Sequence, residues 1–367
     1  MRGLPKACYV DPEFFAAERE RVLLPSWQLV CHVADLPAPG TAIRCDFLGR
    51  SALLLRGPDG TVRGFSNACR HRGSRLIEGD AATGLAFCVD GRVRCPTHGW
   101  EYDARGALVG VPRETQYPGL DRALLGLRPI AVETGLGFVF AAFEPASSAL
   151  ANRLQDCAAE LEPYRLPSLR RLGEPLLRRC RANWKLVCEQ AVDSHRASPA
   201  QPTPRPAVES RHAYARHGEL LRIAGEIDGD DPGAWSMRAY AQWLPEQLQL
   251  PPARRRLWAR YLFWPNLLLD VCPDQVIAQQ ILPLGPADTL VRETTYGVTD
   301  GSHEIKLARY LNRRARRRFA TTDRRVAERM QSGIECGDGG PGPLAGDDQG
   351  VRWFVGRVRA AMPEAGR

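Results

Sequence analysis

The chain has 367 residues, of which 44% are hydrophobic and 25% are charged, and its formal net charge is +8 at pH 7. This composition is close to that of ordinary globular proteins, so it argues against a disordered chain and against a membrane protein, and the length favours two domains. No apolar run reaches the roughly 18 residues of a membrane-spanning helix, and the first residues show no apolar signal segment, so we expect a cytoplasmic protein.

Cysteine and arginine have unusual distributions. The eleven cysteines are odd in number and scattered, which argues against a disulfide framework and predicts metal ligands and reduced thiols. Arginine-rich runs lie at 170–181, 253–260 and 312–319. They indicate either a solvated basic face or a docking surface for an acidic protein. No nucleic-acid-binding motif accompanies them, so we expect no nucleic-acid partner.

Taken in chain order, the elements predict an α+β protein. An Asp-Pro start with apolar residues at helical spacing predicts a helix at 11–27, and short apolar runs between Gly, Pro and Asp turns predict a small all-β domain at 27–145. Strands are then predicted at 258–270, 275–283 and 289–297, and helices at 303–319, 323–334 and 348–362. The predicted division is therefore an N-terminal helix at 1–26, a β domain at 27–145 and an α+β domain at 146–367.

Two short motifs within the β domain supply metal-ligand side chains. CRHRG begins at Cys69 and CPTHGW begins at Cys95, and each contributes one thiol and one imidazole. Four such ligands fit a tetrahedral zinc ion or a [2Fe-2S] cluster, and four buried core residues are the remaining alternative. Two features favour the cluster. Glycines permit tight loops around it, and the aromatic side chains of Trp100 and Tyr102 would shield an inorganic core.

The two motifs resemble the signature of Rieske domains, in particular those of ring-hydroxylating and demethylating oxygenase α subunits. The resemblance implies that one iron is held by Cys69 and Cys95 and the other by His71 and His98. One departure is the connection of 23 residues between His71 and Cys95, which is longer than usual in the family. This connection contains Cys88, to which we assign no role.

The resemblance extends over nearly the whole chain. It includes NWKLVCEQAVD at 183–193, LFWPNLLLD at 262–270, QQILPLGPADT at 279–289 and the helical region from Asp323 onward. It implies a helix-grip fold for the second domain, which in the family holds one Fe(II) with two histidines and one carboxylate. Such a site leaves positions open for O2 and substrate.

The second site departs from the family pattern. In an ungapped alignment from Asn183, the two histidine positions fall on Arg196 and Gln201, the carboxylate ligand falls on Asp323, and the acid that links the two metal centres of neighbouring subunits falls on Asp193. A guanidinium has no acceptor and stays protonated, so Arg196 cannot bind iron. We therefore expect a salt-bridge network in place of mononuclear iron, with Arg196 as its cation.

Three histidines are alternative iron ligands. His195 would enter the site if the alignment slipped by one residue, and His212 and His217 share the spacing of the missing pair further along the chain.

Two functional hypotheses follow. In the first, the chain is an electron-transfer and assembly subunit that needs a catalytic oxygenase homologue, in the mixed ring of three or six subunits that the family implies. In the second, it is itself a monooxygenase or dioxygenase with unusual iron ligands that acts on a small organic substrate; a stand-alone redox or sensing protein is a third, weaker possibility. Electrons would come from NAD(P)H through a separate reductase or ferredoxin, because the chain has no dinucleotide fingerprint.

Overall fold

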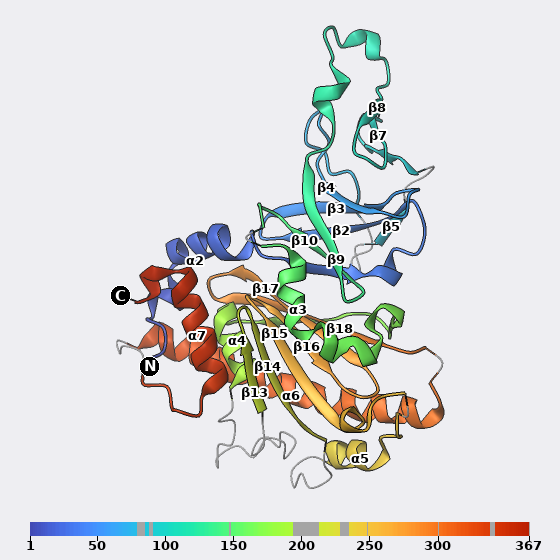
Figure 1. Ribbon diagram of the computed structural model, residues 1–367. Coiled ribbons are helices and arrows are strands. Elements are labelled where there is room, and N and C mark those ends of the chain that lie inside the picture. The colour runs from blue at the N-terminus through green and yellow to red at the C-terminus, as the bar shows by residue number, and fades with distance from the viewer. Residues whose placement is uncertain are drawn as a thin grey trace. The chain divides into compact units, whose positions relative to one another are not determined.

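The computed structural model describes residues 1–78, 85–87, 91–146, 148–193, 213–227, 235–247, 249–299, 301–337 and 342–366. It divides into two compact units, one formed by Leu24–Leu154 and the other by Met1–Leu23 together with Gln155–Arg367 (Figure 1). The predicted α+β class is confirmed, whereas the three predicted domain boundaries stay predictions. None of the described helices is long and apolar enough to cross a membrane.

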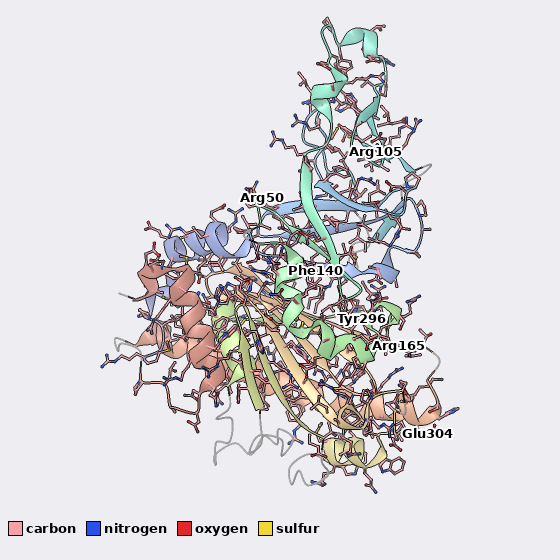
Figure 2. The ribbon with its side chains drawn as sticks, in the orientation of Figure 1. Arg50, Arg105, Phe140, Arg165, Tyr296 and Glu304 are labelled. Carbon is pink, nitrogen blue, oxygen red and sulfur yellow. The ribbon has the colours of Figure 1, made fainter. Side chains whose placement is uncertain are left out.

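The first unit is built on antiparallel sheets, as predicted. Its larger sheet has seven strands in the order β1-β10-β9-β4-β3-β2-β5, and a smaller one has the order β6-β7-β8. The strands are β1 Gln28–His32, β2 Thr41–Phe47, β3 Arg50–Arg56, β4 Val62–Ser66, β5 Leu85–Phe87, β6 Val93–Arg94, β7 Glu101–Tyr102, β8 Leu108–Gly110, β9 Pro129–Gly135 and β10 Phe138–Ala142. Strand residues such as Leu53 and Phe140 are buried in the core of this unit, and Figure 2 labels Phe140.

The second unit contains a larger antiparallel sheet. Its strand order is β11-β18-β17-β16-β15-β14-β13, and β12 also pairs with β18. The strands are β11 Arg170–Arg171, β12 Leu176–Cys180, β13 Ala213–His217, β14 Leu220–Glu226, β15 Leu257–Phe263, β16 Leu267–Val271, β17 Val276–Gly285 and β18 Asp288–Gly297. The strand predicted over 258–270 is in fact a hairpin of β15 and β16, because the chain turns at Trp264–Asn266.

Helices complete this unit. They are α1 Ala7–Val10, α2 Pro12–Glu18, α4 Trp184–Val192, α5 Trp235–Trp243, α6 His303–Cys336 and α7 Gln349–Ala361, and α3 Leu150–Leu161 leads into the unit from the first. The predicted N-terminal helix begins as expected, with the Asp11 side chain accepting a bond from Glu13 N, and ends as a π-helical segment at Arg19–Leu23.

The prediction of separate helices at 303–319 and 323–334 is wrong, since both belong to the single helix α6. Thr321 and Thr322 lie at the expected break. The helix continues through them, and their hydroxyls donate to the carbonyls of Arg317 and Arg318, four residues earlier, instead of capping a new helix.

Candidate functional sites

The two cysteine-histidine motifs form a pair of similar loops in the first unit. In each loop the glycine four residues after the cysteine donates its N–H to the cysteine carbonyl, at 2.9 Å from Gly73 to Cys69 and 3.0 Å from Gly99 to Cys95. Both glycines have positive φ, 73° and 72°. A residue with a Cβ would strain this conformation, which explains glycine at both positions. The two loops therefore share the same backbone turn after the cysteine, although the histidine follows Cys69 by two residues and Cys95 by three.

The two loops enclose one cavity. It has a volume of about 340 Å³ and is lined by Cys69, His71, Arg72, Ser74, Cys95, Thr97 and His98. The imidazole rings of His71 and His98 lie 4.6 Å apart between centroids. His71 Nδ1 is buried and has no hydrogen-bond partner in the described part of the chain. The structure thus brings all four predicted ligands together, with an imidazole nitrogen free to bind a metal.

Aromatic side chains shield this cavity. Trp100 stacks on His71 at 4.8 Å between ring centroids, and Tyr117 contacts both rings edge-on. Tyr102 lies with its hydroxyl 3.2 Å from Cys69 Sγ, and the same hydroxyl accepts the N–H of Arg70 at 3.0 Å. Sequence reasoning identified Trp100 and Tyr102 but missed Tyr117, which comes from a distant loop.

The ligand set fits a [2Fe-2S] cluster. Among the described residues, no group of three or more His, Cys, Asp or Glu side chains could hold one metal ion. Four ligands that surround a cavity, rather than a point, suit a two-iron centre in which each iron takes two of them. A tetrahedral zinc ion would need all four to converge.

A second cavity lies in the other unit. Its volume is about 150 Å³, and its lining comes from β12, α4, α5, the strands β15–β18 and α6. Asp323, the predicted carboxylate ligand, lines it from α6. Asp193 is the C-cap residue of α4, and His217 is exposed on β13. His195, Arg196, Gln201, His212 and Cys88 lie outside the described residues.

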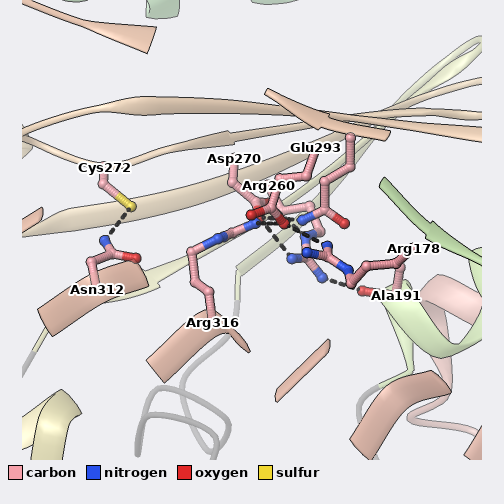
Figure 3. A network of polar contacts seen from close by, with 9 residues as sticks. Arg178, Ala191, Arg260, Asp270, Cys272, Glu293, Asn312 and Arg316 are labelled. Atoms are coloured by element: carbon pink, nitrogen blue, oxygen red, sulfur yellow. Dashed lines mark hydrogen bonds and ion pairs between the residues drawn. The ribbon is translucent and has the colours of Figure 1, made fainter. Parts of the chain in front are cut away.

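A buried network of charges forms one wall of this cavity (Figure 3). Asp270, on β16, has a fully buried side chain and accepts two bonds from Arg260, at 2.6 and 2.8 Å, and one from Arg316 at 2.6 Å. Gln279 makes a longer contact of 3.4 Å with the same carboxylate. Glu293 accepts from Arg178 at 2.8 Å and from Arg316 at 3.4 Å.

The network keeps its acids ionised. Burial alone raises the pKa of Asp270, but the guanidiniums of Arg260 and Arg316 outweigh burial and hold that pKa well below the usual range. Burial likewise raises the pKa of Glu293, and Arg316 and Arg178 reverse the effect. Burial lowers the pKa of Arg260, but the charges of Asp270 and Asp323 outweigh burial and raise that pKa above its usual value. Arg260 therefore stays protonated.

The described residues of this pocket do not fit a two-histidine, one-carboxylate iron site. The described lining residues include Asp323 but no histidine, and guanidiniums from three elements pair with the acids Asp270 and Glu293. Sequence reasoning expected a salt-bridge network here but missed these arginines. Two signals were available: Arg260 and Asp270 are register partners in the β15–β16 hairpin, and Arg316 lies two helical turns before Asp323.

The chain was compared with known proteins. Residues 26–127 match the Rieske [2Fe-2S] domain, and residues 159–364 match the ring hydroxylating alpha subunit (catalytic domain). The glycine betaine monooxygenase oxygenase subunit of Chromohalobacter salexigens is 28% identical, over 94% of this chain and 82% of that protein. The carnitine monooxygenase oxygenase subunit of Escherichia coli K12 is 25% identical, over 95% and 88%.

Solved structures show the same fold. A quaternary ammonium Rieske monooxygenase superposes with a TM-score of 0.82 at 20% identity, over 98% of this chain and 95% of that one. Naphthalene 1,2-dioxygenase from Rhodococcus sp. superposes with a TM-score of 0.74 at 21% identity, over 98% and 94%. The chain therefore belongs to the family of Rieske oxygenase alpha subunits, with a Rieske [2Fe-2S] domain followed by a ring-hydroxylating catalytic domain.

Proposed function

We propose that this chain is an electron-transfer and assembly subunit of a Rieske oxygenase, which carries a [2Fe-2S] cluster but no mononuclear iron. The observation that carries the proposal is the contrast between the two cavities. One is lined by thiols and imidazoles, and the acids of the other are already neutralised by arginines. The cluster would be held by Cys69, His71, Cys95 and His98, and when bound it supplies one-electron redox chemistry.

The charges at the second cavity oppose a metal ion. Arg260 carries a fixed positive charge close enough to Asp323 for that acid to raise the pKa of Arg260, and Arg316 lies two helical turns before Asp323 on α6. A dication bound at Asp323 would be repelled by these guanidiniums in an environment of low dielectric constant. Asp270 cannot compensate, because its oxygens are already used by Arg260, Arg316 and Gln279.

Part of the basic surface is suited to binding an acidic protein partner. The arginine run 253–260 forms internal ion pairs, with Arg254 bound to Glu160 and Arg255 to Glu246. The run on α6 differs, because four of its arginines are exposed and make no ion pair with any described residue: Arg313, Arg314, Arg317 and Arg318. Such a surface suits an acidic electron donor, which we propose to be a reductase or a ferredoxin.

The oxygenase chemistry would then take place on a catalytic homologue in a mixed ring. Asp193 is retained at the position that the family resemblance gives to the acid linking two centres. We propose that it helps to pass electrons from a cluster to such a neighbour.

A second candidate is a self-contained oxygenase. It is favoured by the retention of both acids, Asp193 and Asp323, and by the similarity of nearly the whole chain to monooxygenases of glycine betaine and carnitine. Iron would then need histidines from His195, His212 or His217. This candidate predicts one further iron per chain, which the first does not.

The test is the iron and acid-labile sulfide content of protein purified anaerobically and incubated with Fe(II). Two irons per two sulfides support the proposal, and three irons per two sulfides overturn it in favour of the second candidate. Asp323→Ala adds a check on the same samples. Unchanged iron with reduced folding stability is the expected result, and loss of one iron would contradict the proposal.

A further inference from the structure

The second cavity is suited to a ligand even without a metal. Its volume of about 150 Å³ equals that of engineered protein cavities that admit benzene. Much of the lining is apolar or aromatic, including Met237, Trp258, Leu268 and Phe319. What distinguishes the pocket is the set of charged groups at its wall, and these determine which class of molecule it can hold.

The wall has more hydrogen-bond donors than acceptors. Among the described lining residues, Arg178, Arg260, Arg316 and the exposed Arg324 stand against two acids, Glu293 and Asp323, and counting the buried Asp270 as well leaves one positive charge in this described set. Each guanidinium has five N–H donors, whereas the carboxylate of Asp270 already accepts from three side chains. The Nε of Arg316 is buried and has no hydrogen-bond partner in the described part of the protein. Acceptor oxygens on a ligand would satisfy these donors.

The face of Trp258, the tryptophan in the described lining, is not available to a bound cation. Recognition of a quaternary ammonium group requires an open aromatic face. The tryptophan that lines the pocket, Trp258, already has the guanidinium of Arg260 over its ring, with Cζ at 5.5 Å from the ring centroid. A second cation at Trp258 would find the face of the indole ring already occupied, and it would be repelled by the positive charge of Arg260.

From these contacts we infer that the pocket binds a small organic carboxylate with a compact apolar body, and that it rejects quaternary ammonium cations. The inference rests on the proposed function in one respect, namely that arginines and not a metal balance the acids of the pocket. It reverses the charge preference implied by the names of the betaine and carnitine relatives.

The experiment uses probes of matched shape and calorimetry on the cluster-loaded protein. 3,3-Dimethylbutanoate differs from glycine betaine only by a carbon in place of the ammonium nitrogen, and 3,3-dimethylbutan-1-ol is the corresponding isostere of choline. We expect 3,3-dimethylbutanoate to bind about tenfold or more tightly than glycine betaine and than the alcohol, which is a difference of about 1.4 kcal/mol or more. Equal affinities, tighter binding of glycine betaine, or no binding of the carboxylate would overturn the inference.

Two neighbouring arginines provide a variant and its matched control. Arg178 lines the pocket, whereas Arg179, the next residue on β12, is largely exposed and binds Asp288. Arg178→Gln should reduce carboxylate affinity about tenfold, and Arg179→Gln should leave it unchanged. Equal losses in both variants would show a non-specific charge effect and overturn the inference. The cluster spectrum and melting temperature establish that each variant is folded.

Failure of this inference and failure of the proposed function are distinguishable. A third iron per chain together with selective carboxylate binding would overturn only the absence of mononuclear iron. Two irons without carboxylate binding would overturn only the ligand assignment.

Discussion

The two cavities of this protein differ in the kind of polar group that is left without a described partner, which is an imidazole nitrogen in the first and the guanidinium Nε of Arg316 in the second. In the first unit, the thiols and imidazoles of the two loops surround a cavity and leave His71 Nδ1 without a described partner. In the second, the buried carboxylate of Asp270 is fully bonded by side chains from β15, α6 and β17. A buried polar group that lacks a partner costs free energy, so the first cavity is completed by a bound group.

The two units share the fold of Rieske oxygenases but differ in the side chains that line their cavities. Both units superpose on solved Rieske oxygenases, yet only the first offers a complete ligand set among its described residues. Replacing a metal by guanidiniums is physically reasonable, because it neutralises the same buried acids without a change of fold.

The largest effect is expected at the cluster. Cys95→Ser removes one of four ligands and should abolish the cluster, with loss of bound iron and acid-labile sulfide and of the visible absorption band. Cys45→Ser, a partly buried cysteine of β2 outside the cavity, is the matched control and should retain both. Retention of a full cluster in Cys95→Ser would refute the ligand assignment.

A smaller but still large effect is expected from Asp270→Asn. The change leaves the buried guanidiniums of Arg260 and Arg316 without their carboxylate, at a cost of about 3–5 kcal/mol in the free energy of unfolding. Asp288→Asn removes an acid from a more exposed pair with Arg179 and should cost about 1 kcal/mol or less. Denaturant titration measures both. If iron content fell in Asp270→Asn while the cluster spectrum stayed unchanged, the salt-bridge interpretation would be wrong.

Glu189 is a buried acid of the second unit that differs from Asp270 in its hydrogen-bond donor. It accepts from a neutral group, the hydroxyl of Tyr9, at 2.8 Å. Burial raises its pKa to about 7. The folded state therefore binds this proton more tightly than the unfolded state, and stability should fall as pH rises from about 4.5 to 7.

Glu189→Gln should remove that part of the pH dependence. The variant should be more stable than the parent at neutral pH, by up to about 3 kcal/mol for a change of this size in pKa. Unfolding free energies at several pH values between 4.5 and 8 measure the effect. An unchanged slope in the variant would show that Glu189 is not the group responsible.

The smallest effect concerns the tuning of the cluster. The hydroxyl of Tyr102 lies 3.2 Å from Cys69 Sγ, where it can donate to a cluster-bound thiolate. A hydrogen bond to sulfur stabilises the reduced, more negative cluster, so Tyr102→Phe should lower the reduction potential by about 50 mV with the cluster retained. Protein-film voltammetry measures the shift. An unchanged or raised potential would contradict this role for Tyr102.

The sequence by itself was sufficient for the features whose residues are close in the chain. The spacing of Cys69, His71, Cys95 and His98 predicted a shared site, because two short loops with glycine turns determine most of their geometry. The β texture of the first unit and the mixed class of the second were also predicted, since period-2 and helical patterns are local properties. The division of α6 into two helices was wrong, because the low local helix propensity of Thr321 and Thr322 is overridden by packing of the helix on both sides of them.

The ionic character of the second cavity arises from the packing of distant elements against one another. The sequence predicted a salt-bridge network but assigned its cation to Arg196, which lies outside the described residues, whereas the structure supplies Arg260 and Arg316. These residues and Asp270 come from three elements separated by up to 56 residues, and pairing among many arginines and acids is fixed only when the sheet and α6 pack. Ion pairs are selected by burial and distance, and neither quantity is encoded in sequence spacing alone.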